Sequence, residues 1–116
     1  MKNDKDNLIV NLSVEFALAV IEYCESLEAN RKFVIANQLL KSGTSIGANV
    51  REAQNAESKA DFIHKIKIAA KETEETEYWL VLCEKSSNYP DPTLLKEKLN
   101  SIKNIISKII ITSKKN

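Results

Sequence analysis

The chain has 116 residues, 28% of them charged and 43% apolar, and its formal net charge is +1. This composition excludes a disordered chain, and the length predicts one domain covering residues 1–116. No run of 18 uncharged apolar residues occurs, so we expect no membrane-spanning helix. Only two glycines and two prolines are present, and the long stretches between them favour helices.

Two features bear on the cellular compartment. The N-terminal residues 1–6 lead into no uninterrupted apolar core, so we expect no signal peptide. Cys24 and Cys83 form no Cys-x-x-Cys pair, and two scattered thiols suit a reducing environment. We therefore expect a cytoplasmic protein.

Apolar residues at spacings of three and four predict four helices, at about residues 6–28, 32–56, 59–87 and 92–112. The first helix follows the stripe Leu8, Leu12, Phe16, Ala19, Tyr23 and Leu27. The second follows Ala36, Leu39, Gly43, Ile46, Val50 and Ala53. The phase of this stripe does not change across Gly43 and Gly47. We therefore predict one continuous helix there, although each interior glycine costs about 1 kcal/mol relative to alanine.

The third helix is predicted to begin at Ser58, which forms a capping box with Asp61. Its stripe is Phe62, Ile66, Ala69, Thr73, Thr76, Leu80 and Cys83. Asp91 and Pro92 suit the N-cap and first position of the fourth helix, whose stripe is Leu95, Leu99, Ile102, Ile106 and Ile109. We expect residues 112–116 to fray. Four helices with short connections predict an all-α, antiparallel up-down-up-down four-helix bundle.

Residues that could perform catalysis or bind a metal are few. Di-iron bundles need a Glu-x-x-His motif on each of two helices, whereas this chain has one histidine, His64, in a single Asp-x-x-His. Cys83 lies on a core stripe, where cysteine is typically a small buried hydrophobe. The segment 43–47 lacks the lysine of a phosphate-binding loop. We therefore expect no enzyme, no cofactor and no metal.

Polar and aromatic residues of the third helix are candidates for an interface. Tyr78 and Trp79 are adjacent and point about 100° apart on a helix, so they cannot both face the core. Trp and Tyr are also enriched at interfaces. Glu72 and Glu75 share a helix face, and Arg51 could pair with a carboxylate across an interface. The alternative interpretation of this acidic cluster is a solvated helix face.

The C-terminal quarter is basic, because residues 88–116 hold six Lys or Arg against two Asp or Glu. Lys96, Lys103 and Lys114 fall on nearly one line of the fourth helix, opposite its apolar stripe. This line is a candidate RNA-binding face, which a ring of subunits would repeat. Acidic residues of the first helix could cancel its field, and a solvated face is the alternative.

The run from Ser42 to Ala53, SGTSIGANVREA, resembles a signature of the four-helix bundle protein family, also called 23S ribosomal RNA intervening-sequence proteins. A second block, from Ser58 to Leu80, matches the other signature of that family in order and spacing. Thr73 departs from it, since many relatives carry a small or apolar residue there. The family is similar in fold to the accessory variability protein of diversity-generating retroelements. The resemblance implies a bacterial protein that forms a ring-shaped homopentamer, binds RNA and has no catalytic residue.

These signatures contain polar residues on helices otherwise suited to burial. The candidate oligomer-interface residues are Ser45, Gly47, Asn49, Arg51, Glu52, Glu72, Glu75, Tyr78 and Trp79. The alternative is that the polar ones are satisfied by hydrogen bonds within one subunit. The predicted function is a non-catalytic homo-oligomeric helical scaffold whose partners are other copies of itself and structured RNA or a ribonucleoprotein. The alternative is a protein-interaction module or structural subunit without nucleic-acid binding.

Overall fold

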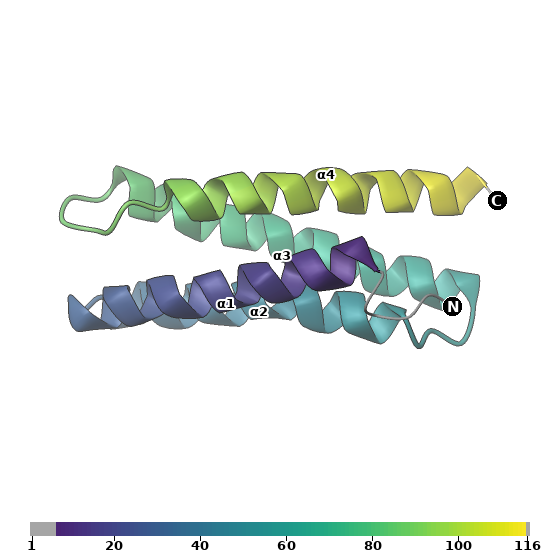
Figure 1. Ribbon diagram of the computed structural model, residues 1–116, viewed down its shortest axis with the longest axis horizontal. Coiled ribbons are helices and arrows are strands. Elements are labelled where there is room, and N and C mark those ends of the chain that lie inside the picture. Colours follow the sequence, from purple (N-terminus) through teal and green to yellow (C-terminus); the bar gives the residue numbers. More distant parts are fainter. Residues whose placement is uncertain (1–6, 116) are drawn as a thin grey trace.

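A computed structural model describes residues 7–115 as four helices. These are α1 (Leu8–Ala29), α2 (Phe33–Ala53), α3 (Lys59–Lys85) and α4 (Thr93–Lys115). Successive helices run in opposite directions along one long axis, as Figure 1 shows. Each helix packs against its two neighbours in the order α1–α2–α3–α4–α1. The predicted all-α up-down-up-down bundle is therefore confirmed.

The helix ends follow local chemistry, with differences from the predicted bounds. The Ser58 side chain accepts a hydrogen bond of 3.0 Å from the Asp61 N–H and caps α3. The helix α4 continues through Thr112 to Lys115, where fraying was expected. Lys114 and Lys115 lie in its last turn, where cations interact favourably with the helix dipole. The predicted start of the first helix at residue 6 and the end of the tail at residue 116 lie outside the described residues.

The helix α2 is continuous through Gly43 and Gly47, as predicted, and the two glycines let α1 approach closely. A Cβ atom on Gly43 would lie 3.0 Å from both Cγ atoms of Val20. A Cβ atom on Gly47 would lie 3.3 Å from the Ser13 Oγ. The small residues of the signature therefore accommodate a helix of the same chain.

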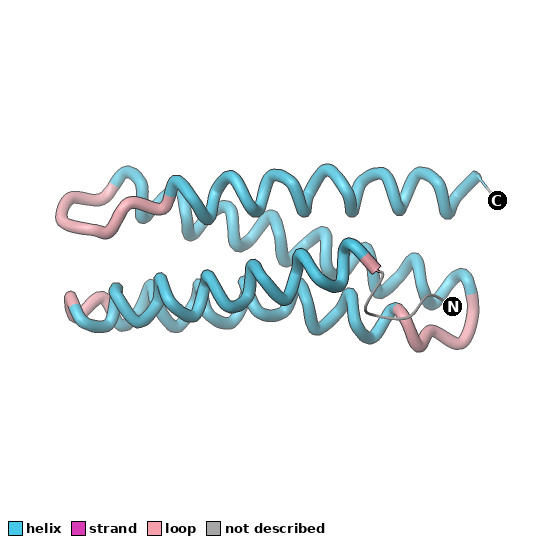
Figure 2. The backbone as a smooth tube through the Cα atoms, viewed as in Figure 1, coloured by secondary structure: helices cyan, strands magenta, loops and turns pink. Residues whose placement is uncertain are grey.

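The predicted stripes form one core between the four helices. Its largest fully buried side chains include Phe16, Leu27, Leu39, Ile46, Ile66, Leu80, Leu99, Ile102 and Ile106. Leu8 differs from the prediction, because it lines a surface hollow beside α4 and is 60% exposed, whereas Ile9 and Val10 of the same turn are buried. The connections between helices lie at the two ends of the bundle (Figure 2), so the helix faces form its long sides. Of the described helices, none has the length and apolarity needed to cross a membrane.

Candidate functional site

The predicted interface residues gather mainly on the side of the bundle where α2 meets α3. Two contacts fix this side: the Ser42 and Thr76 hydroxyls are hydrogen-bonded at 3.0 Å, and the Lys65 Nζ lies 3.0 Å from a Glu52 carboxylate oxygen. Residues three or four apart share a helix face, which places two groups along this side. They are Ser45, Asn49 and Glu52 of α2, and Glu72, Glu75 and Trp79 of α3.

Hydrogen bonds within α2 satisfy the polar signature residues. The Asn49 side-chain amide donates to the Ser45 carbonyl at 2.9 Å, and the Ser45 hydroxyl donates to the Lys41 carbonyl at 2.7 Å. Hydrogen bonds within the subunit therefore satisfy the side chains of Ser45 and Asn49, as the alternative interpretation predicts. No interfacial partner is required to explain them.

Gly47 and Arg51 lie on a different side of α2. Gly47 contacts α1 through Ser13, and Arg51 follows Gly47 by one helical turn on the same face. Within one subunit Arg51 therefore lies on another side than Glu72 and Glu75, and its pairing with a carboxylate across an interface stays a prediction. On the α2–α3 side, Lys65 pairs with Glu52, and the charge of Lys41 acts on Glu72.

Aromatic and acidic groups of α3 form a small cluster at the surface. The Tyr78 and Trp79 rings meet edge to face, with centroids 5.1 Å apart. The Trp79 indole N–H donates to a Glu75 carboxylate oxygen at 3.3 Å. Partial burial, together with the nearby charge of Glu75, raises the pKa of the Glu72 carboxyl, against an opposing effect of Lys41. Tyr78 is 57% exposed and Trp79 is partly buried, so neither belongs to the core.

The predicted RNA-binding line is not an open basic face. Lys103 lies 2.9 Å from Glu74 and 2.7 Å from Glu77 of α3, and hydrogen bonds to these carboxylates raise the pKa of its ammonium. Lys96 lies 2.7 Å from Glu84. The predicted line lies beside the apolar stripe and borders α3, because Lys103 follows Ile102 by one residue, or about 100°. Lys114, at the end of this line, is exposed.

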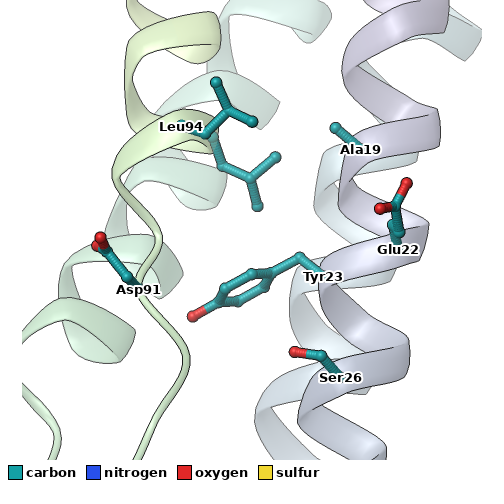
Figure 3. Close-up of a pocket in the computed structure, with 7 residues that line it drawn as sticks. Ala19, Glu22, Tyr23, Ser26, Asp91 and Leu94 are labelled. Carbon is teal, nitrogen blue, oxygen red and sulfur yellow. The ribbon is translucent and has the colours of Figure 1, made fainter.

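The boundary between α1 and α4 carries a feature that no sequence pattern indicated. A hollow of about 290 Å³ opens there, lined by Ala19, Glu22, Tyr23, Ser26, Asp91, Leu94 and Leu95. Figure 3 shows the Tyr23 ring pointing from α1 toward the segment before α4. Its hydroxyl donates to the Pro90 carbonyl at 2.6 Å, and burial raises its pKa. The hydrogen bond of the Tyr23 hydroxyl holds the loop before α4 against α1. Leu94, which also lines the hollow, remains 63% exposed.

The two thiols are structural. Cys24 is buried and donates to the Ala36 carbonyl at 3.4 Å, and burial raises its pKa to about 12. Burial also raises the pKa of Cys83, although the Tyr23 hydroxyl opposes this shift. A thiol held protonated is a poor nucleophile. Within residues 7–115, no three His, Cys, Asp or Glu side chains gather closely enough to hold a metal ion.

This chain is similar to known proteins in both sequence and structure. The family model described as 23S rRNA-intervening sequence protein matches residues 5–111. A crystal structure of a protein of unknown function from the S23 ribosomal protein family of Bacteroides thetaiotaomicron is similar to this chain. It is 40% identical, its TM-score is 0.83, and the match covers 88% of this chain and 97% of that one.

No curated protein matches the sequence, and these comparisons lend no support to the similarity with the accessory variability protein. The family match spans nearly the whole chain and both signature blocks. The chain therefore belongs to the 23S rRNA-intervening sequence protein family.

Proposed function

We propose that this protein is a non-catalytic helical scaffold that assembles with copies of itself and, once assembled, holds RNA or a ribonucleoprotein. The observation that carries the proposal is the family match over residues 5–111, together with a bundle whose surface retains large exposed apolar side chains. The family name refers to an intervening sequence of 23S rRNA. The resemblance of the signature blocks favours a pentamer in the bacterial cytoplasm.

Self-association is supported by the amount of apolar side chain left in solvent. Val14, Leu18 and Leu94 are 43%, 61% and 63% exposed, and large exposed apolar patches mark interaction sites. A small bundle also gains stability when copies bury such side chains against one another. Assembly would place the surface of every subunit at several positions around one particle.

RNA binding is supported by the basic C-terminal quarter. Among its lysines, Lys98, Lys108, Lys114 and Lys115 take part in no ion pair with the described residues. Each subunit would offer few phosphate contacts, and repetition around an oligomer would multiply them. The proposed RNA contact therefore depends on assembly.

The alternative function, a protein scaffold without nucleic acid, is favoured by a specific observation. Lys96 and Lys103 are held by three carboxylates of α3, so two of the three predicted RNA-binding lysines are neutralised within the subunit. This pairing supports a structural role for the α4 lysines.

Two measurements on the purified wild type test the proposal. Light scattering should report an oligomer, and a monomer of 13.1 kDa at micromolar concentration would refute self-association. Titration with a transcript of a structured rRNA segment across a salt series should then show affinity that falls as salt rises. An oligomer that binds no RNA even at low salt would replace the RNA role with the protein-scaffold alternative.

A further inference from the structure

The helix α1 carries a second apolar stripe on the side turned away from the core. Val14, Leu18 and Ile21 follow one another at spacings of four and three, so they share one face. They are 43%, 61% and 39% exposed. A helix that is apolar on both sides is normally buried on both sides. This face therefore requires a cover that residues 7–115 of one subunit do not provide.

Two glutamates extend this face toward the end of α1. Glu25 and Glu28 continue the same spacing, and neither forms an ion pair with the described residues. The last turn of α1 holds no basic residue, and a negative charge is unfavourable at the C-terminal end of a helix. The two carboxylates are therefore unfavourably placed within one subunit, and a cationic partner would offset this effect. We name Val14, Leu18, Ile21, Glu25 and Glu28 the α1 stripe.

The helix α4 carries a stripe of opposite charge. Its members recur at spacings of four and three: Leu94, Lys98, Ser101, Ile105, Lys108 and Thr112. They line successive hollows of about 290, 200 and 260 Å³ along α4. The first two also contain α1 residues, among them Glu22 and Glu15. In contrast to Lys96 and Lys103, the two lysines of this α4 stripe form no ion pair with the described residues.

We propose that a second copy of this chain covers these faces, with the α1 stripe of one subunit packed on the α4 stripe of the next. The inference rests on the proposed self-association and specifies its geometry. The apolar side chains of the two stripes would pack together, and the carboxylates of the α1 stripe would face the ammonium groups of the α4 stripe. The two surfaces are therefore complementary in charge. A contact between two α1 stripes would offer no cationic side chain to Glu25 and Glu28.

The two stripes are different surfaces of one subunit, so the contact is heterologous. Each subunit then has one α1 stripe and one α4 stripe to offer, and repeated contacts close into a ring if the rotation allows it. The arrangement also employs Lys98 and Lys108 in protein contacts. These two lysines would therefore not be available to RNA.

Reciprocal charge reversal tests the pairing. Glu25→Lys/Glu28→Lys makes both stripes basic, and Lys98→Glu/Lys108→Glu makes both acidic. Each variant alone should associate at least about tenfold more weakly than the wild type. The combined variant Glu25→Lys/Glu28→Lys/Lys98→Glu/Lys108→Glu should regain assembly, because a basic α1 stripe then meets an acidic α4 stripe at every contact, whatever the number of subunits. The control Lys67→Glu/Lys71→Glu changes exposed charges on α3 and should assemble as the wild type does.

The readouts separate folding, self-association and this pairing. Circular dichroism should show unchanged helicity for all variants, so that a loss of assembly is not a loss of folding. A monomeric wild type would refute the proposed function as well. A wild-type oligomer with reversed variants that assemble equally well, or with a combined variant that stays dissociated, would overturn this pairing alone.

An apolar pair of variants gives an independent test. Leu18→Glu places a charge in the centre of the α1 stripe, whereas Val34→Glu does so at a similarly exposed position outside both stripes. Leu18→Glu should reduce the oligomer to monomers at micromolar concentration, and Val34→Glu should leave it intact. Equal behaviour of the two variants would overturn the assignment of the interface to α1.

Discussion

The hydroxyls of Ser42 and Thr76 are hydrogen-bonded at 3.0 Å between α2 and α3, and both side chains are almost fully buried. Thr76 also hydrogen-bonds to the Glu72 carbonyl at 2.7 Å. The pair is a buried polar contact between the two helices, whereas the ion pair of Lys65 and Glu52 lies nearer the surface. It fixes their relative position, because neither hydroxyl has water as a substitute partner.

Removal of one member of this pair should destabilise the fold. Thr76→Val leaves the Ser42 hydroxyl without its interhelical partner and should cost about 1 to 3 kcal/mol of unfolding free energy. The double variant Ser42→Ala/Thr76→Val should lose less than the sum of the two single variants, since no buried hydroxyl is left unpaired. Urea unfolding at one fixed protein concentration measures the cycle. Strictly additive losses would contradict this coupling.

The two glycines of α2 should differ in their tolerance of a methyl group. Gly43→Ala meets the branched Val20 side chain at 3.0 Å, and overpacking of about 1 to 3 kcal/mol should outweigh the helix-propensity gain of about 1 kcal/mol. Gly47→Ala meets the Ser13 Oγ at 3.3 Å and should be milder. Gly47→Leu should again destabilise the fold or weaken assembly. Urea midpoints for the three variants test this ranking, and a stabilised Gly43→Ala would contradict close α1–α2 packing.

Stability should fall at alkaline pH because of the buried thiols. The pKa of Cys24 rises from an ordinary 9.0 to about 12 in the folded state, and that of Cys83 is also raised. Above about pH 9 the unfolded chain releases protons that the folded chain retains, so the free energy of unfolding decreases with pH. One group contributes a slope of at most about 1.4 kcal/mol per pH unit.

The variant Cys24→Ala isolates this contribution. Its unfolding free energy should be lower at neutral pH, because the substitution removes buried volume, but it should decline less steeply between about pH 8 and about pH 10.5. Tyr23 still contributes to the decline, since burial raises its pKa too. Parallel declines of wild type and variant would show that Cys24 does not titrate as described.

Lysines already held in ion pairs should contribute little to RNA binding. Lys96→Gln/Lys103→Gln removes charges that α3 carboxylates neutralise, so RNA affinity and its salt dependence should not change. Lys114→Gln/Lys115→Gln removes exposed charges and should lower the salt slope by up to about 0.9 for each phosphate that is no longer neutralised. Filter binding across a salt series compares the two variants. A large effect of the first variant alone would restore Lys96 and Lys103 as phosphate ligands.

The fold was predictable because local and periodic signals agreed. The stripe through Gly43 kept its phase, and Ser58 and Asp61 marked the start of α3 as the structure confirms. The partners of surface charges were not predictable to the same degree. Lys103 meets Glu77, which is 26 positions away in the sequence, and only the packing of α4 beside α3 brings them together.

The second apolar stripe of α1 was visible in the sequence, but its role was not predictable there. Val14, Leu18 and Ile21 have the same spacing as the buried stripe, so periodicity alone marks a helix that is apolar on two sides. The sequence shows which residues share each stripe, but it does not show which stripe is covered by another subunit. Its significance follows from the exposed fractions in the folded bundle.

The mass of the wild-type protein in solution tests the central claim most directly. Size-exclusion chromatography with light scattering, at micromolar concentration, should give a single species at an integral multiple of the 13.1 kDa subunit mass, with a pentamer as the expected size. The Leu18→Glu variant should elute as a folded monomer in the same experiment. A wild-type protein of 13.1 kDa across the accessible concentration range would contradict the account of an assembling scaffold.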